Sequence, residues 1–294
     1  MICVRIIGGL GNQLFQYATG RALALRHGCE LLLDVSHLQT CARHVTPRQF
    51  ELDHFRYQAR VATAAETRHL AWLHRVPAFS HWVTPWRTYV ERGLGFNASF
   101  AELPDDTYLV GYWQSPQYFA SVGGQIAAEL SAAQPLSPES EAVAEAISRG
   151  PSVMLHVRRG DYVTLTSAAT LHGTLGLSYY EAALQRMREQ VEGARYFVFS
   201  DDIAWCREHL PLAAAEAVYV GNNTGANAWQ DLLLMARCRH HIIANSSFSW
   251  WGAWLADQRF GESDHMVIAP SRWFAGKPGE DLSNRFPVHW VVQP

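Results

Sequence analysis

Apolar runs alternate with amphipathic stretches along the second half of the chain. The runs lie at 152–157, 196–200, 217–220, 241–245 and 265–269, and between them apolar residues recur every three or four positions. Runs of this length are typical of buried strands, and the intervening periodicity is typical of helices. Because strands and helices alternate regularly, the pattern predicts a parallel, doubly wound α/β domain.

The first half starts with a similar unit and then loses its pattern. Residues 3–7 predict a strand, Leu14 to Leu25 carry helical spacing with Gly28 as a stop, and residues 30–35 predict a second strand. Residues 107–113 predict another strand, whereas residues 36–106 give no clear periodicity. We therefore expect a second Rossmann-like domain whose middle part cannot be read from the sequence.

The segment 132–151 has the features of a junction between the two domains. It contains a short helical pattern with Ser137 as cap, Pro138 at the first position and Gly150 after the end. We place an N-terminal domain at 1–148 and a C-terminal domain at 149–294.

Composition narrows the class of protein. The 294 residues are 48% hydrophobic and 17% charged with a net charge of -3, which argues against disorder and against a nucleic-acid partner. The five cysteines are odd in number and scattered, which indicates a reducing compartment rather than a disulfide framework. No apolar stretch reaches the roughly 20 residues of a membrane span. These features predict a cytoplasmic protein without an integral membrane segment.

Polar residues follow every predicted strand of the second half. The segments are HVRRGD (156–161), SDD (200–202), GNNTG (221–225), NSS (245–247) and PSRW (270–273). The carboxyl ends of parallel strands lie along one edge of a sheet, and ligands bind at that edge. The sequence therefore predicts a ligand site there.

Two adjacent arginines stand at the end of the strand 152–157. Successive strand residues point to opposite faces, so Arg158 and Arg159 cannot serve the same purpose. A guanidinium at this edge suits a phosphate, which Arg158 would grip at two points. Arg159 has two open interpretations, namely contact with the ligand or an ion pair with Asp161 or another carboxylate.

Other residues at this edge extend the prediction to a nucleoside diphosphate. Ser246 and Ser247 precede a predicted helix, whose free amides and hydroxyls can hold an anion. Asp201 and Asp202 suit hydroxyls or the N–H edge of a base, although one of them is expected to be a plain helix cap.

The N-terminal loop Gly9-Leu10-Gly11 resembles a dinucleotide fingerprint without completing it, because position 14 is Leu14. Asn12 and Gln13 instead offer side-chain hydrogen bonds, which favours a polyhydroxylated ligand. The chain has no His-Glu-x-x-His and no Asp-x-Asp, so we expect no metal and no other cofactor.

Several segments resemble the bacterial α-1,2-fucosyltransferases of glycosyltransferase family 11. They are residues 8–24, 50–55, 109–119, 156–163, 197–202, 245–256 and 269–274, in order along nearly the whole chain. The resemblance implies two Rossmann-like domains facing across a cleft, the GT-B type, with GDP-fucose bound by the C-terminal domain. It also implies metal-independent transfer of fucose, with inversion, to the 2-hydroxyl of a terminal galactose.

The resemblance also implies roles for individual residues. Arg158 would hold the β-phosphate as a catalytic residue, while Asp202, or less favourably Asp201, would bond the guanine. The base that takes the acceptor proton would be Asp161 or a relayed water, and Arg159 would brace the loop. The other residues implied around GDP-fucose are His156, Asn245, Ser246, Ser247 and Phe248, and those implied around the fucose and acceptor are Gly9, Gly11, Asn12 and Gln13.

Alternatives remain open from the sequence. The chain could be another GDP-sugar-dependent transferase, a non-catalytic carbohydrate-binding protein, or an oxidoreductase that uses the first glycine loop for NAD. For the favoured activity the partners are GDP-fucose and a galactose-terminated oligosaccharide or lipid-linked glycan. The location is then cytoplasmic, either free or peripheral at the inner face of the membrane.

Overall fold

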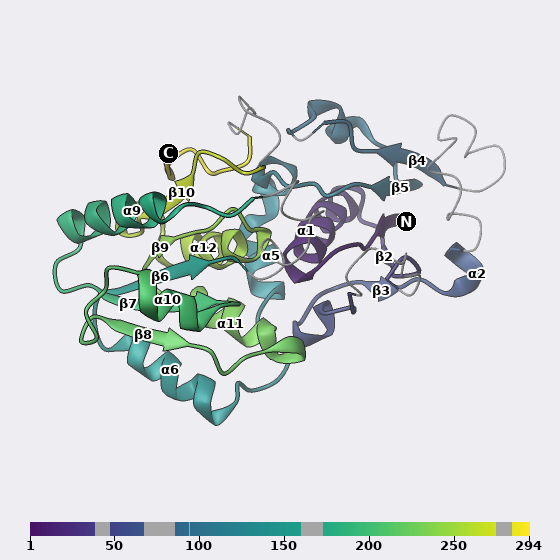
Figure 1. The fold of residues 1–294 in the computed structure, drawn as a ribbon. Helices are drawn as coiled ribbons and strands as arrows, with labels where there is room; N and C mark the ends of the chain where they lie inside the picture. The colour runs from purple at the N-terminus through teal and green to yellow at the C-terminus, as the bar shows by residue number, and fades with distance from the viewer. Residues whose placement is uncertain (39–47, 68–85, 94, 160–172, 275–283) are drawn as a thin grey trace. The chain divides into compact units, whose positions relative to one another are not determined.

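The computed structural model describes residues 1–38, 48–67, 86–93, 95–159, 173–274 and 284–294. These residues form two compact units (Figure 1). Unit 1 contains residues 1–134 with residues 284–285, and unit 2 contains residues 135–274 with residues 286–294. Each unit is built on a parallel sheet, so the predicted α/β class with two Rossmann-like domains is confirmed.

Unit 1 has a five-stranded sheet in the order β3-β2-β1-β5-β4, and every pairing is parallel. Its elements in chain order are β1 (Ile2–Arg5), α1 (Leu10–His27), β2 (Leu31–Asp34), η1 (Leu52–His54), β3 (Arg60–Val61), α2 (Ala64–Thr67), β4 (Arg87–Val90), η3 (Ala98–Glu102), β5 (Thr107–Val110), η4 (Pro116–Tyr118), η5 (Ala120–Val122) and α5 (Gly123–Glu129).

The helix α1 is flanked by glycines, with Gly9 at its N-cap and Gly28 at its C-cap, and Gly28 is the predicted stop. Gly28 takes the left-handed conformation at φ 59° and its N–H bonds the carbonyl of Leu25, which closes the last turn. At the other end Gly8 has φ 78°, and a Cβ there would lie 2.7 Å from Nδ2 of Asn12. The tight turn from β1 into α1 therefore requires glycine.

Unit 2 has a six-stranded sheet in the order β11-β10-β9-β6-β7-β8, again with parallel pairings. Its elements in chain order are α6 (Pro138–Ser148), β6 (Ser152–Val157), α9 (Leu177–Gln190), β7 (Arg195–Ser200), α10 (Ile203–His209), β8 (Ala217–Val220), η6 (Gly225–Asn227), α11 (Ala228–Met235), β9 (His240–Ile242), α12 (Ser247–Phe260), η7 (Glu262–Asp264), β10 (Val267–Pro270) and β11 (Val291–Gln293).

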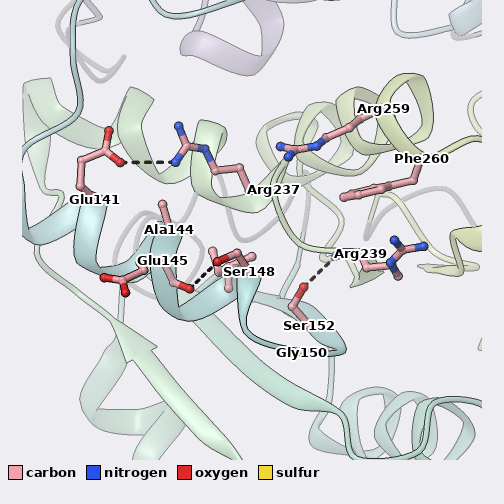
Figure 2. Close-up of a pocket in the computed structure, with 11 residues that line it drawn as sticks. Glu141, Ala144, Glu145, Ser148, Gly150, Ser152, Arg237, Arg239, Arg259 and Phe260 are labelled. Atoms are coloured by element: carbon pink, nitrogen blue, oxygen red, sulfur yellow. Dashed lines mark hydrogen bonds and ion pairs between the residues drawn. The ribbon is translucent and has the colours of Figure 1, made fainter.

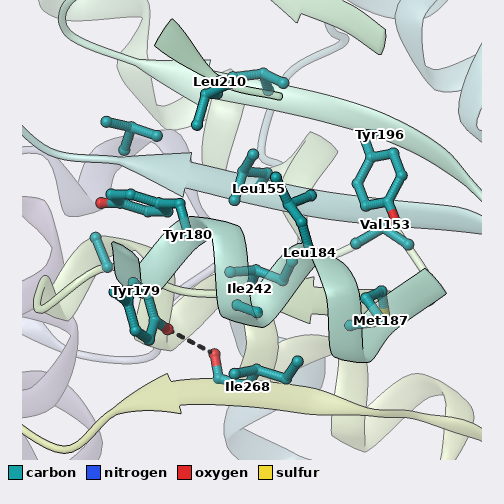
Figure 3. Packing of buried hydrophobic residues seen from close by; sticks show 14 of the residues in the cluster. Val153, Leu155, Tyr179, Tyr180, Leu184, Met187, Tyr196, Leu210, Ile242 and Ile268 are labelled. Atoms are coloured by element: carbon teal, nitrogen blue, oxygen red, sulfur yellow. Dashed lines mark hydrogen bonds between the residues drawn. The ribbon is translucent and has the colours of Figure 1, made fainter. Parts of the chain in front are cut away.

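A hydrophobic core lies between α9 and one face of this sheet (Figure 3). Val153 and Leu155 of β6 pack there against Leu184 and other apolar side chains of α9, all fully buried. Each such side chain contributes about 1.5–3 kcal/mol when it leaves water. The buried hydroxyl of Tyr179 donates to the carbonyl of Ile243 at 2.8 Å, so the core leaves this polar group satisfied.

The opposite face of the sheet is covered by α12. Its three tryptophans, Trp250, Trp251 and Trp254, are all buried and contact one another, so they belong to the core. In the part of the chain that the structure describes, no helix is both long and apolar enough to cross a membrane.

The boundary between the units differs from the predicted one. The division falls between residues 134 and 135, so α6 belongs to unit 2 and not to a domain ending at residue 148. The Oε1 atom of Gln230 on α11 accepts from the N–H of Ser137 at 2.7 Å, and the buried hydroxyl of Ser140 bonds Asn223. Capping and packing therefore tie α6 to α11, which the local helix signals could not reveal.

Candidate functional site

The unit 2 sheet has a topological switch point between β6 and β9. The chain runs from β6 through β7 to β8 on one side and from β9 through β10 to β11 on the other. A crevice opens at the carboxyl ends of the two strands where the direction reverses, and ligands of such sheets bind there. The segments that follow β6 and β9 are the arginine pair and Asn245-Ser246-Ser247, so the predicted site residues gather at the switch point.

The two arginines after β6 have different surroundings. Arg158 Nη1 lies 3.0 Å from Oδ2 of Asp201, which follows the neighbouring strand β7. The guanidinium of Arg159 lies 4.0 Å from the centre of the Trp205 ring, and its Nε is 3.6 Å from Oδ2 of Asp202. Arg159 thus packs on α10, and the carboxylate beside it is Asp202.

The two aspartates that follow β7, Asp201 and Asp202, also have different hydrogen-bond partners. Asp202 is the N-cap of α10, because its Oδ1 accepts from the N–H of Trp205 at 3.1 Å. Asp201 accepts from the backbone N–H of Arg159 at 2.9 Å with Oδ1, while Oδ2 faces Arg158. Asp201 therefore orients the arginine loop, whereas the half-exposed Asp202 keeps lone pairs for a ligand.

His156 lies one residue before the end of β6 with its side chain in the interior. Burial and the nearby Arg158 guanidinium lower the pKa of His156 to about 3, so the imidazole is neutral at physiological pH. Its Nδ1 has no hydrogen-bond partner among the described residues, and its ring centre lies 6.1 Å from that of Phe248. A buried imidazole with one unsatisfied nitrogen is costly, which is typical of a group reserved for a ligand.

The N-terminus of α12 completes this edge. Ser246 is the N-cap, and its hydroxyl accepts from the N–H of Phe248 at 3.3 Å. Ser247 is the first helical residue, is half-buried, and makes no side-chain hydrogen bond to the residues that the structure describes. The free amides and the positive end of the helix dipole suit an anion.

Asn245 has a structural role as well. Its side chain is buried, and its amide nitrogen donates to the carbonyls of Gly173 at 3.1 Å and Trp273 at 3.3 Å. Both amide hydrogens are therefore used to hold neighbouring segments in place. The residue supports the edge of the sheet, a role that its neighbours in sequence could not indicate.

Unit 1 has its own switch point between β1 and β5. The strands β2 and β3 lie on one side of β1, whereas β5 and β4 lie on its other side. Gly9 is the N-cap of α1 there, and Gly11 lies buried in the first turn. Asn12 is half-buried and its Oδ1 accepts from Gln114 Nε2 at 2.7 Å. These three residues lie where a ligand of unit 1 is expected.

Gln13 is a correction to the predicted site. Its side chain is fully buried, with Nε2 donating to the carbonyls of Gly8 and Gln49 and Oε1 accepting from the N–H of Glu51. All of its amide groups are therefore engaged by the backbone. Gln13 fixes the segment 49–51 against α1 and does not face a ligand.

Two residues at the unit 1 switch point were missed from the sequence, Glu91 and Tyr112. The carboxylate of Glu91 accepts from the N–H groups of Tyr112 and Trp113, and Tyr112 is exposed. Neither residue had a signal in the sequence, because Tyr112 lay inside the strand predicted at 107–113, which ends at Val110 in the structure, and Glu91 lay in the segment without a clear pattern. Asp161, the predicted base, lies outside the described residues.

A pocket of about 590 Å³ lies elsewhere, at the amino ends of β6 and β9 (Figure 2). Its arginines follow or end helices, and Arg237 and Arg239 lie within 3.6 Å of Glu141 and Asp264 respectively. Arginines at helix C-termini balance the negative dipole ends. Since ligands of parallel sheets bind at the carboxyl edge, the switch points are the better candidates. Among the described residues there is also no group of three side chains that could hold a metal ion.

Comparison with known proteins agrees with this geometry. The family model "Glycosyl transferase family 11" matches residues 77–291. An Escherichia coli protein named O-antigen biosynthesis glycosyltransferase WbnK is 32% identical over 94% of the chain and 96% of its own length. The Escherichia coli α-1,2-colitosyltransferase is 29% identical over 93% of the chain and 92% of its own length.

A mouse protein, galactoside 2-α-L-fucosyltransferase Sec1, is 26% identical over 87% of the chain and 64% of its own length. Among solved structures, that of NodZ α-1,6-fucosyltransferase soaked with GDP-fucose matches with a TM-score of 0.51 at 15% identity, covering 86% of this chain and 92% of that one. This likeness supports the two-domain fold of the GT-B type. Because the family model matches most of the length of the chain, the chain belongs to glycosyltransferase family 11 and is a glycosyltransferase.

Proposed function

We propose that the protein transfers L-fucose from GDP-fucose to the 2-hydroxyl of a terminal galactose, with inversion at the anomeric carbon and without a metal ion. The observation that carries the proposal is the unit 2 switch point. There β6 carries the neutral His156 and is followed by Arg158, and the neighbouring strand β9 leads into the N-terminus of α12. The names of the relatives, which include α-1,2 and fucosyl transferases, support the sugar and the linkage.

The reaction is a displacement at the anomeric carbon of fucose. The oxygen of the galactose 2-hydroxyl forms a bond to that carbon, and the bond to the β-phosphate oxygen breaks with its electron pair leaving on GDP. Negative charge therefore grows on the diphosphate. A fixed guanidinium and helix amides can stabilise this charge without a metal, and losing one such donor costs about 10²–10³ in rate.

The residues around the switch point divide the remaining tasks in this proposal. Ser247 and the first amides of α12 hold the diphosphate, His156 gives its free nitrogen to the nucleotide, and Asp202 accepts from the guanine. Asp201 positions Arg158 through their ion pair. The proton of the acceptor goes to Asp161 or to a relayed water. In unit 1, the residues that contact the acceptor are Gly9, Gly11 and Asn12.

A second candidate is transfer of colitose, which is fucose without its 3-hydroxyl. The similarity to a colitosyltransferase favours it. The two activities share the same phosphate chemistry and differ only in contacts to one hydroxyl of the sugar. For either sugar, the acceptor would be a galactose-terminated oligosaccharide or lipid-linked glycan. The proposal includes a cytoplasmic location, free or at the inner face of the membrane.

The test is product analysis with the full chain, GDP-fucose and lactose. Carbon–proton NMR correlations should connect fucose C1 to galactose H2 in an α-linkage, and 2′-deoxylactose should give no product. Activity should survive excess EDTA, and kcat/KM should be higher for GDP-fucose than for GDP-colitose. A different linkage contradicts the proposed transfer to the 2-hydroxyl. Loss of activity in EDTA that Mn²⁺ restores contradicts the proposed metal independence.

A further inference from the structure

The two switch points carry different chemistry. In unit 2 the edge presents a guanidinium, two serines and helix amides, which suit phosphates. In unit 1 the turn after β5 carries the exposed Tyr112, and Gln114, two residues further on, donates to Asn12 of the glycine loop. An aromatic ring with neutral amides suits a sugar, which has an apolar face and several hydroxyls.

Tyr112 is unusual in its exposure. Its side chain is 48% exposed, and no other aromatic residue that the structure describes falls in the exposed class. Leaving much of a large aromatic side chain in water forgoes part of the free energy that its burial would contribute. Tyr112 follows β5 by two residues, and β5 pairs with β1 at the switch point, with Val4 opposite Leu109.

The backbone that presents Tyr112 is held in a costly conformation. Trp113, the next residue, has φ 57°, a left-handed backbone conformation that is strained for a non-glycine residue. Its side chain is fully buried and packs on Tyr89, Phe100 and Tyr118, which anchors the turn in the core of unit 1.

Glu91 at the end of β4 holds this turn. Its Oε2 accepts from the N–H of Tyr112 at 2.7 Å, and both its oxygens lie 3.0 Å from the N–H of Trp113. The carboxylate leaves little room around it, since a Cβ on Gly111 would lie 2.5 Å from the Cβ of Glu91. A carboxylate and a residue in the left-handed conformation therefore hold the backbone of the turn that carries Tyr112.

The neighbouring amides are ordered as well. Arg285 donates to Oε1 of Gln114 at 2.5 Å, and Nε2 of Gln114 donates to Oδ1 of Asn12 at 2.7 Å. Because Arg285 donates to the oxygen of Gln114, Gln114 presents its amide nitrogen to Asn12. The Asn12 amide therefore uses its oxygen in this contact, and its nitrogen is left as a donor for another partner. Within the described part of the chain, that nitrogen makes no hydrogen bond, so it is available to a hydroxyl of a ligand.

We infer that Tyr112 is the acceptor-binding platform, on which the apolar face of the terminal galactose stacks while the Asn12 amide donates to one of its hydroxyls. Glu91 is a positioning residue that acts by holding the turn. The inference rests on the proposed function, which supplies the galactoside acceptor.

The test compares variants of the full chain with lactose as the probe, measuring turnover at saturating GDP-fucose and, separately, lactose binding by saturation-transfer NMR. Tyr112→Ala should raise the KM for lactose about tenfold, as expected for the loss of one stacked aromatic contact. Its KM for GDP-fucose should stay within about twofold, since the phosphate-binding residues lie in unit 2. Tyr112→Phe keeps the ring and should recover the KM for lactose to within about threefold of the wild type. Val61→Ala, an exposed apolar residue at the far edge of the same sheet, is the matched control and should change neither constant.

Glu91→Gln keeps the size of the side chain but loses one acceptor for the two N–H groups. It should raise the KM for lactose while the KM for GDP-fucose stays unchanged, a split that a general loss of stability would not produce. Undiminished lactose binding by Tyr112→Ala overturns the inference, as does an equal rise of both KM values. Absence of fucose transfer by the wild-type protein overturns the proposed function instead, and the NMR measurement still reports on Tyr112.

Discussion

Arg158 and Asp201 form an ion pair across the ends of β6 and β7, with Nη1 3.0 Å from Oδ2. The same carboxylate accepts from the N–H of Arg159, so one side chain orients the whole arginine loop. Asp201 is thus placed to direct the Arg158 guanidinium and at the same time to repel a phosphate.

Asp201→Asn separates these two effects. The amide keeps the size of the side chain but loses the charge that holds Arg158, so kcat should fall about tenfold, which corresponds to roughly 1.4 kcal/mol. The affinity for GDP should stay equal or become tighter, because a negative charge near the diphosphate is removed. Calorimetry with GDP and steady-state kinetics check both values. Unchanged kcat with lost GDP affinity would show that Asp201 contacts the nucleotide directly.

Ser246 and Ser247 should respond differently to the same substitution. Ser246 caps α12, so Ser246→Ala should cost about 1 kcal/mol and lower the Tm by about 2–4 °C. Ser247 caps nothing, so Ser247→Ala should leave the Tm unchanged and weaken GDP binding about tenfold, the size of one hydrogen bond to a charged group. Thermal unfolding and GDP titration of the two variants provide the comparison. If Ser247→Ala instead lowers the Tm and Ser246→Ala weakens GDP binding, Ser247 is not part of the phosphate site.

Much of unit 2 could be predicted because its central strands are short and largely buried, with apolar residues at most positions. β6 and β7 both have this pattern, and the polar segments after them could be recognised as strand ends. By contrast, β3 has two exposed residues and β4 is only half-buried, so neither leaves a periodic signal in the segment 36–106. The turn at Trp113 was not predictable either, since its strain depends on Glu91 from another strand.

Side-chain roles were harder to predict than strand ends. Gln13 and Asn12 are adjacent polar residues in a glycine loop, and the sequence gives them the same role. Only the contact of Gln13 with residues 49–51, far along the chain, shows that it is structural. The bonds of the Asn245 amide nitrogen could not be predicted for the same reason, because its partners at Gly173 and Trp273 lie on other segments.

Gln13→Ala should therefore affect stability more than activity. It removes hydrogen bonds to Gly8, Gln49 and Glu51 in a fully buried position, which should cost about 2–4 kcal/mol. Asn12→Ala, at a half-buried position, should cost little stability and should raise the KM for lactose. Urea unfolding together with kinetics distinguishes the two. A fully stable Gln13→Ala with a raised KM would restore the residue to the acceptor site.

Asp231 should make stability depend on pH. Burial raises the pKa of Asp231 from its ordinary value of 3.8 to about 7, although the Asn223 amide opposes this by donating at 2.7 Å. Between these values the folded protein keeps the proton that the unfolded chain has lost, so this residue lowers stability as pH rises from about 4 to 7. Asp231→Asn keeps the acceptor for Asn223 without the charge.

The Tm of Asp231→Asn relative to the wild type should therefore rise between pH 4 and pH 8. Thermal scans at both values test this. A difference in Tm that is the same at pH 4 and pH 8 would show that the carboxyl ionises at its ordinary pKa.

The most direct test of the account is the kcat of Arg158→Lys for fucose transfer to lactose, measured beside Arg159→Lys. Lysine keeps the charge of Arg158 but loses the planar grip on a diphosphate whose charge grows toward the transition state. We predict that kcat falls by about 10²–10³ while the KM for GDP-fucose changes much less. Arg159→Lys loses the contact with the Trp205 ring and should lower the Tm while keeping most of the kcat. Normal turnover by Arg158→Lys, with a fully folded but inactive Arg159→Lys, would contradict the assignment of Arg158 to the leaving diphosphate.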